Sequence, residues 1–415
     1  MKTDKGTVAM KYRISSSRHC LVMVMLSLAA ASSNVYAESD YQALQNEVQA
    51  LRQELSELRA LVKQQSASQE DVKSLRQEVK ATSRAQSEAT NADSVAHIAG
   101  YAAVGLTDRS QSGGSAFSVA SFNPIFHFLY KDIALAEAEL EIAAAPDGTT
   151  ETKLEYASID IFLNDNTTLV AGKILSPLGY FRQNLHPAWV NKFPSITPGF
   201  GEGQAAPSSE VGLGVRGGYP LGEGKKLKYA LYVGNGPELE VDGSEIHGIE
   251  SDGYTRDVDH RKVVGGRIGL VPLPRLELGI SAADGGVGLE GEPDRSYRVL
   301  GTDVGYQWKQ LDLRAEYISQ RVGDLATSVA PDGGTWKAWY GQASYKFLPT
   351  KWEGVLRYGK YISPHADQRQ EQWAVGVNYL WGPSVMAKLG YEFNQGLAGE
   401  NTDANRWLLQ FAYGF

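Results

Sequence analysis

The chain has 415 residues, of which 48 are acidic, 40 are basic and one is a cysteine, so its net charge is −8. One cysteine excludes a disulfide framework and a zinc site built from CxxC pairs, and the acidic balance gives no support to nucleic-acid binding. Beyond the N-terminal region, no stretch approaches the ~20 apolar residues that a membrane-spanning helix requires.

Residues 1–37 have the order of a secretory signal peptide. An apolar run over residues 20–31 follows a region with three basic side chains, Lys11, Arg13 and Arg18. Residues 35–37, Val-Tyr-Ala, then supply a cleavage site of the usual kind. Either Met1 or Met10 begins this signal. An uncleaved membrane anchor is the alternative, but the apolar run is too short for it.

Residues 38–80 contain a heptad seam, and we interpret them as a coiled coil. Apolar residues recur at alternating spacings of four and three, namely Leu44, Val48, Leu51, Leu55, Leu58 and Val62. So narrow a stripe favours self-association over a single amphipathic helix packed on the next domain, although mixed Val and Leu do not fix the number of chains. Residues 81–94, rich in Ala, Ser and Thr, are interpreted as a linker.

From residue 95 to residue 415, alternating apolar and polar runs are separated by two kinds of connection. Seven connections are very short and lie near residues 131, 164, 221, 272, 309, 348 and 382. Eight others, mostly longer and polar, lie at about 108–114, 146–150, 175–209, 236–260, 284–294, 323–334, 363–370 and 396–405. The two kinds alternate, as in a membrane barrel with short turns at one end and long loops at the other. The pattern predicts an all-β transmembrane barrel of about 16 antiparallel strands.

The segment 134–142 is the hardest to assign, because its helix propensity is high. As a strand, it places Glu137, Glu139 and Glu141 on one face, whereas a helix would spread these glutamates around its circumference. We therefore expect a strand. A soluble sandwich or propeller is the alternative for the whole region, but its strands would rarely carry charge on one face and aromatic residues on the other.

If the apolar strand faces meet lipid, the opposite faces line a wet pore, where a charge costs little. The acidic residues fall on the third and fourth strands and the basic ones mostly on the sixth to eighth, which predicts a transverse field that orients polar solutes. The alternative is that these charges pair across neighbouring strands and serve only the barrel. The predicted pore-lining residues are Glu137, Glu139, Glu141, Asp160, Arg216, Lys228, Arg267 and Arg314.

The last ten residues, 406–415, alternate strictly, and one face of this segment is wholly apolar or aromatic. A last strand that ends in Phe, with aromatic residues two and four positions earlier, resembles the C-terminal strand of bacterial outer-membrane barrels. In those proteins the strand is the signal read by the barrel-assembly machinery. The resemblance implies this role for Phe411, Tyr413 and Phe415, and contact of their face with outer-membrane lipid.

The longest connection, 175–209, mixes aromatic with basic side chains and is too aromatic for a disordered segment. Its position matches the third outer loop of general porins, which folds inward and narrows the pore. The resemblance implies a constriction formed by Arg182, His186, Trp189 and Lys192, whose basic groups attract anions. Deletion of residues 182–192 is then expected to raise the single-channel conductance. A loop packed outside, against a neighbouring subunit, is the alternative.

The whole pattern resembles general and phosphate-selective porins, extended by an N-terminal coiled coil. This implies a channel for small polar or anionic solutes in the outer membrane of a Gram-negative bacterium, a homotrimer, and a periplasmic coil that could reach peptidoglycan. A barrel that tethers the envelope and a barrel enzyme are the alternatives. We expect no catalytic residues, cofactor or metal. No GxSxG, HExxH or P-loop motif is present, and the seven His residues include no close pair with metal spacing. The match of Gly212, Gly214 and Gly217 to GxGxxG is followed by no helix, which argues against a dinucleotide site.

Overall fold

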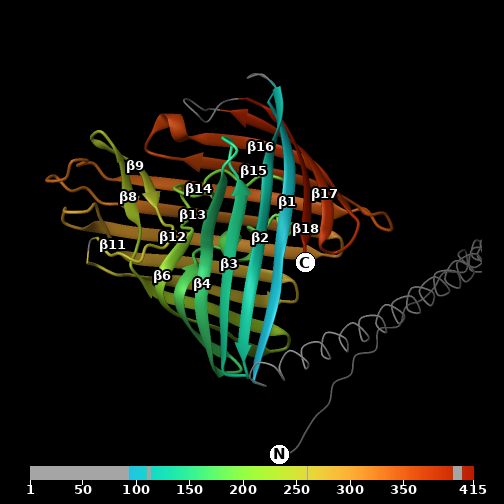
Figure 1. Ribbon diagram of the computed structural model, residues 1–415, viewed down its shortest axis with the longest axis horizontal. Helices are drawn as coiled ribbons and strands as arrows, with labels where there is room; N and C mark the ends of the chain where they lie inside the picture. The colour runs from blue at the N-terminus through green and yellow to red at the C-terminus, as the bar shows by residue number, and fades with distance from the viewer. Residues whose placement is uncertain (1–92, 110–113, 259, 396–403) are drawn as a thin grey trace, which may run out of the picture. The chain divides into compact units, whose positions relative to one another are not determined.

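The computed structural model describes residues 93–109, 114–258, 260–395 and 404–415. Sixteen antiparallel strands form a closed barrel, in which each strand pairs with the next along the chain and β1 pairs with β18 (Figure 1). The barrel strands are β1 (Ser94–Arg109), β2 (Gly114–Tyr130), β3 (Ala134–Ala144), β4 (Thr150–Asn164), β5 (Thr167–Leu175), β6 (Ser209–Gly222), β7 (Lys225–Gly234), β10 (Val263–Leu273), β11 (Leu276–Val287), β12 (Arg295–Trp308), β13 (Leu311–Val322), β14 (Gly334–Lys346), β15 (Trp352–Ile362), β16 (Gln370–Leu380), β17 (Val385–Gln395) and β18 (Arg406–Gly414). The prediction of a 16-stranded barrel is confirmed.

The connections also alternate as predicted. Every short turn joins the strands expected from the sequence, so all seven turns lie at one end of the barrel, which we call the turn end. The longer connections meet at the other end, the loop end, and one of them contains the short 3-10 helix η1 (Ala366–Gln368). The segment with high helix propensity is the strand β3, in which Glu139 is buried and pairs with Tyr156 of β4. Tertiary pairing therefore overrides the local preference.

One long connection contains structure that the sequence interpretation missed. Residues 236–260, one of the longer polar connections, form a hairpin of β8 (Glu238–Asp242) and β9 (Glu245–Glu250) outside the barrel sheet. Its Leu239, Ile246 and Ile249 are buried against the interior core. These apolar side chains were the available signal, because a fully solvated loop does not need them.

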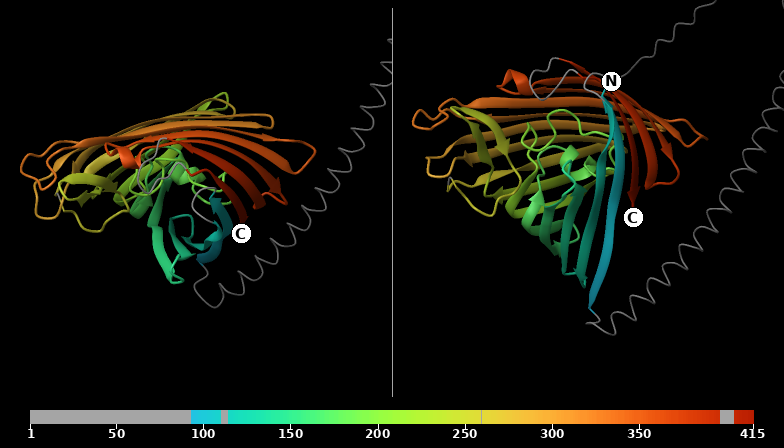
Figure 2. Two further views of the ribbon diagram at one scale, coloured as in Figure 1. Left: turned by 90° about the horizontal axis from the view of Figure 1, so that it is seen from above. Right: turned by 45° about the horizontal axis from the view of Figure 1, so that its top comes forward.

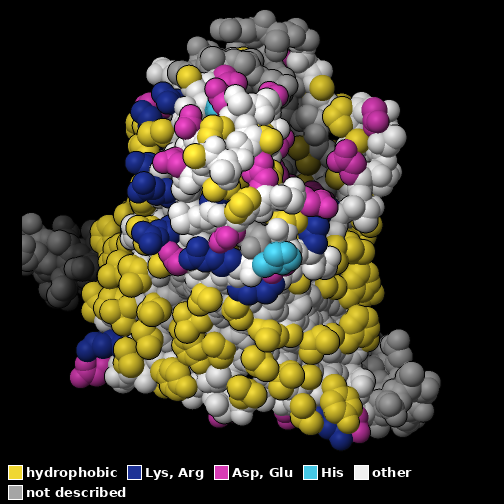
Figure 3. Space-filling view, turned by 90° about the vertical axis from the view of Figure 1, so that its left-hand side faces the viewer, with side chains coloured by type: hydrophobic (Ala, Val, Ile, Leu, Met, Phe, Trp, Pro, Cys, Tyr) yellow, Lys and Arg dark blue, Asp and Glu magenta, His cyan; other side chains and the backbone are white. Residues whose placement is uncertain are grey.

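The outer surface of the barrel is apolar. Trp407, Phe411 and Tyr413 of β18 are each about half exposed, whereas Leu408 and Ala412 on the opposite face are buried. Figure 3 shows hydrophobic side chains covering the lower part of this surface in a broad band, with Lys, Arg, Asp and Glu side chains gathered above it. A band of this kind is the surface that a bilayer covers in transmembrane barrels.

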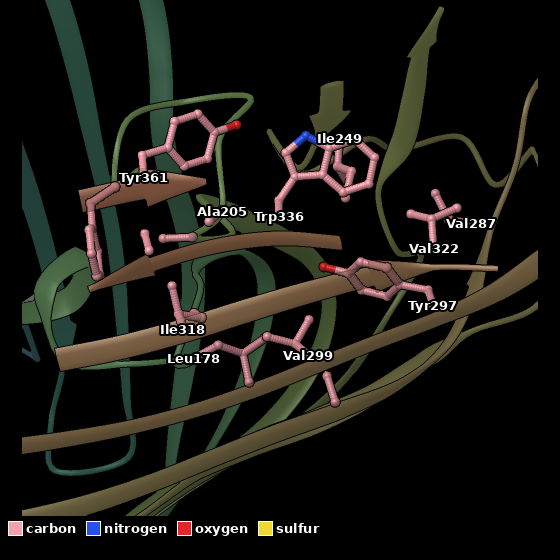
Figure 4. Packing of buried hydrophobic residues seen from close by; sticks show 14 of the residues in the cluster. Leu178, Ala205, Ile249, Val287, Tyr297, Val299, Ile318, Val322, Trp336 and Tyr361 are labelled. Atoms are coloured by element: carbon pink, nitrogen blue, oxygen red, sulfur yellow. The ribbon is translucent and has the colours of Figure 1, made fainter. Parts of the chain in front are cut away.

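The longest connection, residues 176–208, lies inside the barrel, and we call it the inner loop. Figure 2 shows it in green, within the curved wall of strands. It contains the short helix α2 (Phe181–Leu185). Its Leu178 and Ala205 join a buried cluster with Val299 and Ile318 of the wall (Figure 4). The barrel therefore has a packed interior on one side, built largely from its own connection.

In the described part of the chain, no helix has the length and apolar character needed to cross a membrane. The predicted signal peptide (1–37), the predicted coiled coil (38–80) and all but the last two residues of the predicted linker (81–94) lie outside the described residues.

Candidate functional site: the barrel interior

The first half of the inner loop is tied to β13. The backbone N–H groups of Tyr180 and Phe181 each donate to the Glu316 carboxylate over 3.0 Å. Gly179 donates its N–H to the Ser281 hydroxyl over 2.9 Å. A side chain at Gly179 is excluded twice, since its φ is +82° and a Cβ would lie 1.9 Å from a Glu316 oxygen. Glu316 therefore holds the loop in place from the wall.

The second half of the inner loop is tied to β15–β18. The Lys192 ammonium lies 3.1 Å from the Glu353 carboxylate, and Arg357 donates to the carbonyl and hydroxyl of Ser195 over 2.8 and 2.7 Å. Phe193 packs on Gly390 so closely that a Cβ there would lie 2.6 Å from its ring. This side of the interior is consequently filled by buried ion pairs and hydrogen bonds, which are costly to leave unpaired.

The opposite side of the interior keeps three adjoining cavities between the inner loop and the wall. The acid cavity has a volume of about 340 Å³ and is lined by Glu137 and Glu139. The basic cavity, about 360 Å³, shares Arg216 and the inner-loop residues Gln183 and Asn184 with it. The turn-end cavity, about 540 Å³, shares Tyr180, Lys228 and Glu277 with the basic one. We call these three cavities the passage.

Four basic groups of the passage have a carboxylate partner. Lys228 lies 2.6 Å from Glu277, and Arg267 lies 2.6 Å from Asp303 and 3.1 Å from Glu277. The Lys228–Glu277 and Arg267–Asp303 pairs each reach across one intervening strand of the sheet, whereas Arg267 and Glu277 lie on neighbouring strands. Two further pairs are Arg216 with Asp160, and Arg314 with Asp312 at 2.9 Å.

Tyr180 completes the lining from the inner loop. The guanidinium groups of Arg267 and Arg314 lie over its ring, with their Cζ atoms 5.3 and 5.2 Å from the ring centroid. A cation over an aromatic face is attracted by the ring quadrupole. The ring thus keeps two cations at one edge of the basic and turn-end cavities.

Six of the eight residues predicted to line a pore do line the passage, namely Glu137, Glu139, Arg216, Lys228, Arg267 and Arg314. Asp160 is buried beneath its partner Arg216, and Glu141 is half-buried on β3. Glu137 and Glu139 line the acid cavity, but Arg216 lines it too, and Glu277 lines the other two cavities beside Lys228, so the charges are not fully separated along the wall.

The four residues predicted to form a constriction are not brought together. His186 lines the acid cavity. Arg182 is buried and donates to the Ser208 hydroxyl over 2.9 Å. Trp189 and Lys192 line a fourth cavity of about 310 Å³, which we call the far cavity and which shares Asp312 and Arg314 with the turn-end cavity. In the described inner loop, four polar side chains line the acid and basic cavities, namely those of Tyr180, Gln183, Asn184 and His186.

The sequence interpretation missed several lining residues. Tyr156 and Ser158 lie on the same face of β4 as Asp160, so alternation from that aspartate was the available signal. No local signal distinguishes Gln183 and Asn184, because their position depends on how the inner loop is tied to distant strands.

Neither a protein-family model nor a curated protein matches the chain. Solved structures do. The outer membrane channel DcaP of Acinetobacter baumannii is 12% identical with a TM-score of 0.53, over 79% of this chain and 99% of that one. The anion-selective porin from Comamonas acidovorans is 12% identical with a TM-score of 0.52, over 78% and 100%. OmpT of Vibrio cholerae, in its trimer form, is 12% identical with a TM-score of 0.52, over 78% and 99%. These likenesses show that the chain has the porin-type barrel fold.

Proposed function

We propose that the chain is an outer-membrane porin, which forms a water-filled channel for small polar solutes. The observation that carries the proposal is the passage itself, a row of three cavities with charged linings inside a closed barrel. Charged groups beside water cost little, whereas the apolar outer band would be unfavourable in water and is stable in lipid. The similar structures described as a channel and as an anion-selective porin support this function.

The inner loop is the element that narrows this channel. Its contacts fill the side of the barrel along β15–β18 and leave the passage along β3–β7 and β10–β13. The width of the channel is then set by Tyr180, Gln183, Asn184 and His186 rather than by the barrel's diameter. The intermingled carboxylates and cations of the wall favour polar solutes over phosphate, for which an uninterrupted series of basic groups is more suitable.

The remaining parts of the proposal concern assembly. We propose that residues 1–37 direct export, that the short turns face the periplasm, and that the barrel-assembly machinery recognises the last strand. The coiled coil of residues 38–80 would then lie in the periplasm, where it could contact peptidoglycan. The heptad seam supports self-association without fixing the number of chains, and one similar structure described as a trimer supports a homotrimer. The mass of the detergent-solubilised mature chain, with and without residues 38–80, tests both the trimer and the contribution of the coil.

The channel function is tested by ion conductance in planar lipid bilayers. The purified mature chain should insert and produce discrete current steps in KCl. The matched control is a chain folded in detergent but heated to unfold it before addition, which should produce none. A folded protein that leaves the bilayer impermeable to KCl would exclude the channel.

A further inference from the structure

We propose that the acid and basic cavities together form a binding site for zwitterionic solutes, of which short peptides with free amino and carboxyl ends are the best fit. The site would take the amino end beside Glu137 and Glu139 and the carboxyl end beside Arg216 and Lys228. This inference rests on the proposed channel function and adds the class of solute that the passage selects.

The acid cavity offers an acceptor that the protein leaves unused. His186 Nδ1 lies 2.5 Å from the carbonyl oxygen of Arg182, so Nδ1 carries the hydrogen and Nε2 of the neutral ring carries a lone pair. This Nε2 is buried and has no hydrogen-bond partner, and the side chain is 9% exposed. Buried polar atoms are nearly always satisfied. An acceptor left without a protein partner at the wall of a cavity is therefore available to a donor from the passage, which is water or a ligand that displaces it.

Carboxylates stand beside that acceptor. Glu139 Oε1 lies 3.8 Å from His186 Nε2 and accepts from the Tyr101 hydroxyl over 2.8 Å. Glu137 lines the same cavity and lies 3.1 Å from His127. An ammonium group has three donors and no acceptor, so it can satisfy His186 Nε2 and a carboxylate at the same time.

The adjoining basic cavity has the opposite character. It is lined by three cations, Arg216, Lys228 and Arg267, and by one carboxylate, Glu277. The side chains of Arg216 and Lys228 are 50% and 48% exposed, so both retain donors for a solute in addition to their protein partners. Arg216 lines both cavities and marks where the charge of the lining changes sign.

The join between the two cavities suits a peptide. Gln183 and Asn184 line both, and their amides can donate to and accept from a peptide bond. The acid cavity also has apolar lining from Val170, Ile174 and Pro187, which can cover small side chains. A solute with a single charge gains from one cavity and is repelled by the other, whereas a zwitterion gains from both.

The test compares three peptides of nearly equal size on single channels in planar bilayers at constant ionic strength. Trialanine is a zwitterion, N-acetyl-trialanine is an anion and trialanine amide is a cation. The measured quantity is the concentration of each peptide that halves the KCl current. We expect trialanine to act at a concentration about threefold lower than either analogue, the size of effect of a half-exposed ion pair.

Two substitutions separate the two ends of the site. Glu137→Gln should remove the advantage of trialanine over N-acetyl-trialanine, because the charge that attracts the amino end is lost. Lys228→Gln should remove its advantage over trialanine amide, and Glu277 keeps Arg267 as a partner in that variant. Lys346→Gln is the matched control, since this lysine lines the far cavity. In this variant the blocking concentration of each peptide should stay within about 1.5-fold of its value in the unsubstituted protein, which is well below the effect of a half-exposed ion pair.

Equal block by the three peptides, or strongest block by a singly charged one, would overturn the inference without needing any variant. The inference would also be overturned if Glu137→Gln and Lys228→Gln each changed the blocking concentrations of all three peptides by the same factor. Absence of KCl current would instead reject the channel function itself, so the two failures are distinguishable.

Discussion

At the scale of single residues, the interior uses its charges in two ways. Some hold the inner loop, as when the Glu316 carboxylate accepts two backbone N–H groups. Others, such as Lys228, line the passage and keep part of their surface exposed. The strand pattern alone places both kinds on the inner face and does not distinguish them. The two kinds are distinguished only by whether the side chain contacts the inner loop.

Gly179→Ala should disturb the channel as well as the fold. The positive φ is unfavourable for Ala by ~1 kcal/mol, and the added Cβ would lie 1.9 Å from Glu316, so the inner loop has to move. Gly148→Ala is the matched control, with a φ of +86° and open space around its Cβ. We expect altered single-channel conductance in the first variant only. The same conductance in both would contradict the role of Glu316 as the anchor of the loop.

Removing the charge of Lys228 should make the channel less favourable to anions, whereas removing that of Lys346 should not. Lys228 lines the basic and turn-end cavities, but Lys346 lines the far cavity. The zero-current potential in a KCl gradient should therefore shift toward cation preference in Lys228→Gln and stay unchanged in Lys346→Gln. An equal shift in both variants would show that Lys346 also acts on the permeating ions.

At the scale of elements, the strands and turns could be predicted from the sequence, whereas the inward course of the inner loop was implied only by the resemblance to porins, and its contacts could not be predicted. Alternation defines each strand, and turn-forming residues such as those near 164 and 382 join it to the next, so each hairpin is encoded by residues that are close in the sequence. The position of the inner loop depends on partners such as Glu316 and Glu353, more than a hundred positions away. No local pattern encodes such contacts. The four residues chosen for a constriction were therefore selected by type, without knowledge of the direction in which each points.

The β8–β9 hairpin should be more stable in acid. Burial, followed by the like charges of nearby carboxylates, raises the pKa of Glu250 above its usual value of about 4.3. Between the unfolded and folded pKa values the folded hairpin binds more protons, so its stability falls as the pH rises through that window. Because Glu250 is partly exposed, we expect an effect of only a few tenths of a kcal/mol.

Limited proteolysis at the turn of that hairpin measures this effect. Cleavage of the unsubstituted protein should accelerate from pH 4.5 to pH 7.5, after correction for the protease's own pH dependence with a free peptide. Glu250→Gln should reduce this acceleration. Glu223→Gln, which changes a highly exposed carboxylate in a turn, is the control and should leave it unchanged. The expectation fails if Glu250→Gln and Glu223→Gln behave alike.

At the scale of the whole molecule, the barrel is closed by the first and last strands. β1 pairs with β18 from Tyr101–Gly414 to Arg109–Arg406, and Gly100 exchanges two backbone hydrogen bonds with Phe415, of 3.0 and 2.9 Å. Phe415 also stacks on Phe122 of β2, with ring centroids 5.7 Å apart. The last residue is therefore part of the closure and not an appendage to it.

Deleting Phe415 should lower the yield of folded barrel, because the closure loses two backbone hydrogen bonds and an aromatic contact. The measurement is the fraction that resists SDS until it is heated, after folding into lipid vesicles. Phe393→Ala is the control, since this residue is also an exposed aromatic on the outer face, on the neighbouring strand β17. A similar yield for the two variants would show that any outer aromatic serves equally.

The pairing of the two chain ends has a consequence for biosynthesis. Until β18 is available, the chain can form only an open sheet, with β1 and the last formed strand as unpaired edges. Joining these edges spans almost the whole described chain and carries the largest loop-closure entropy of any strand pair in it. Ring closure is therefore the last strand pairing to form, and each copy needs protection from intermolecular strand addition until β18 meets β1.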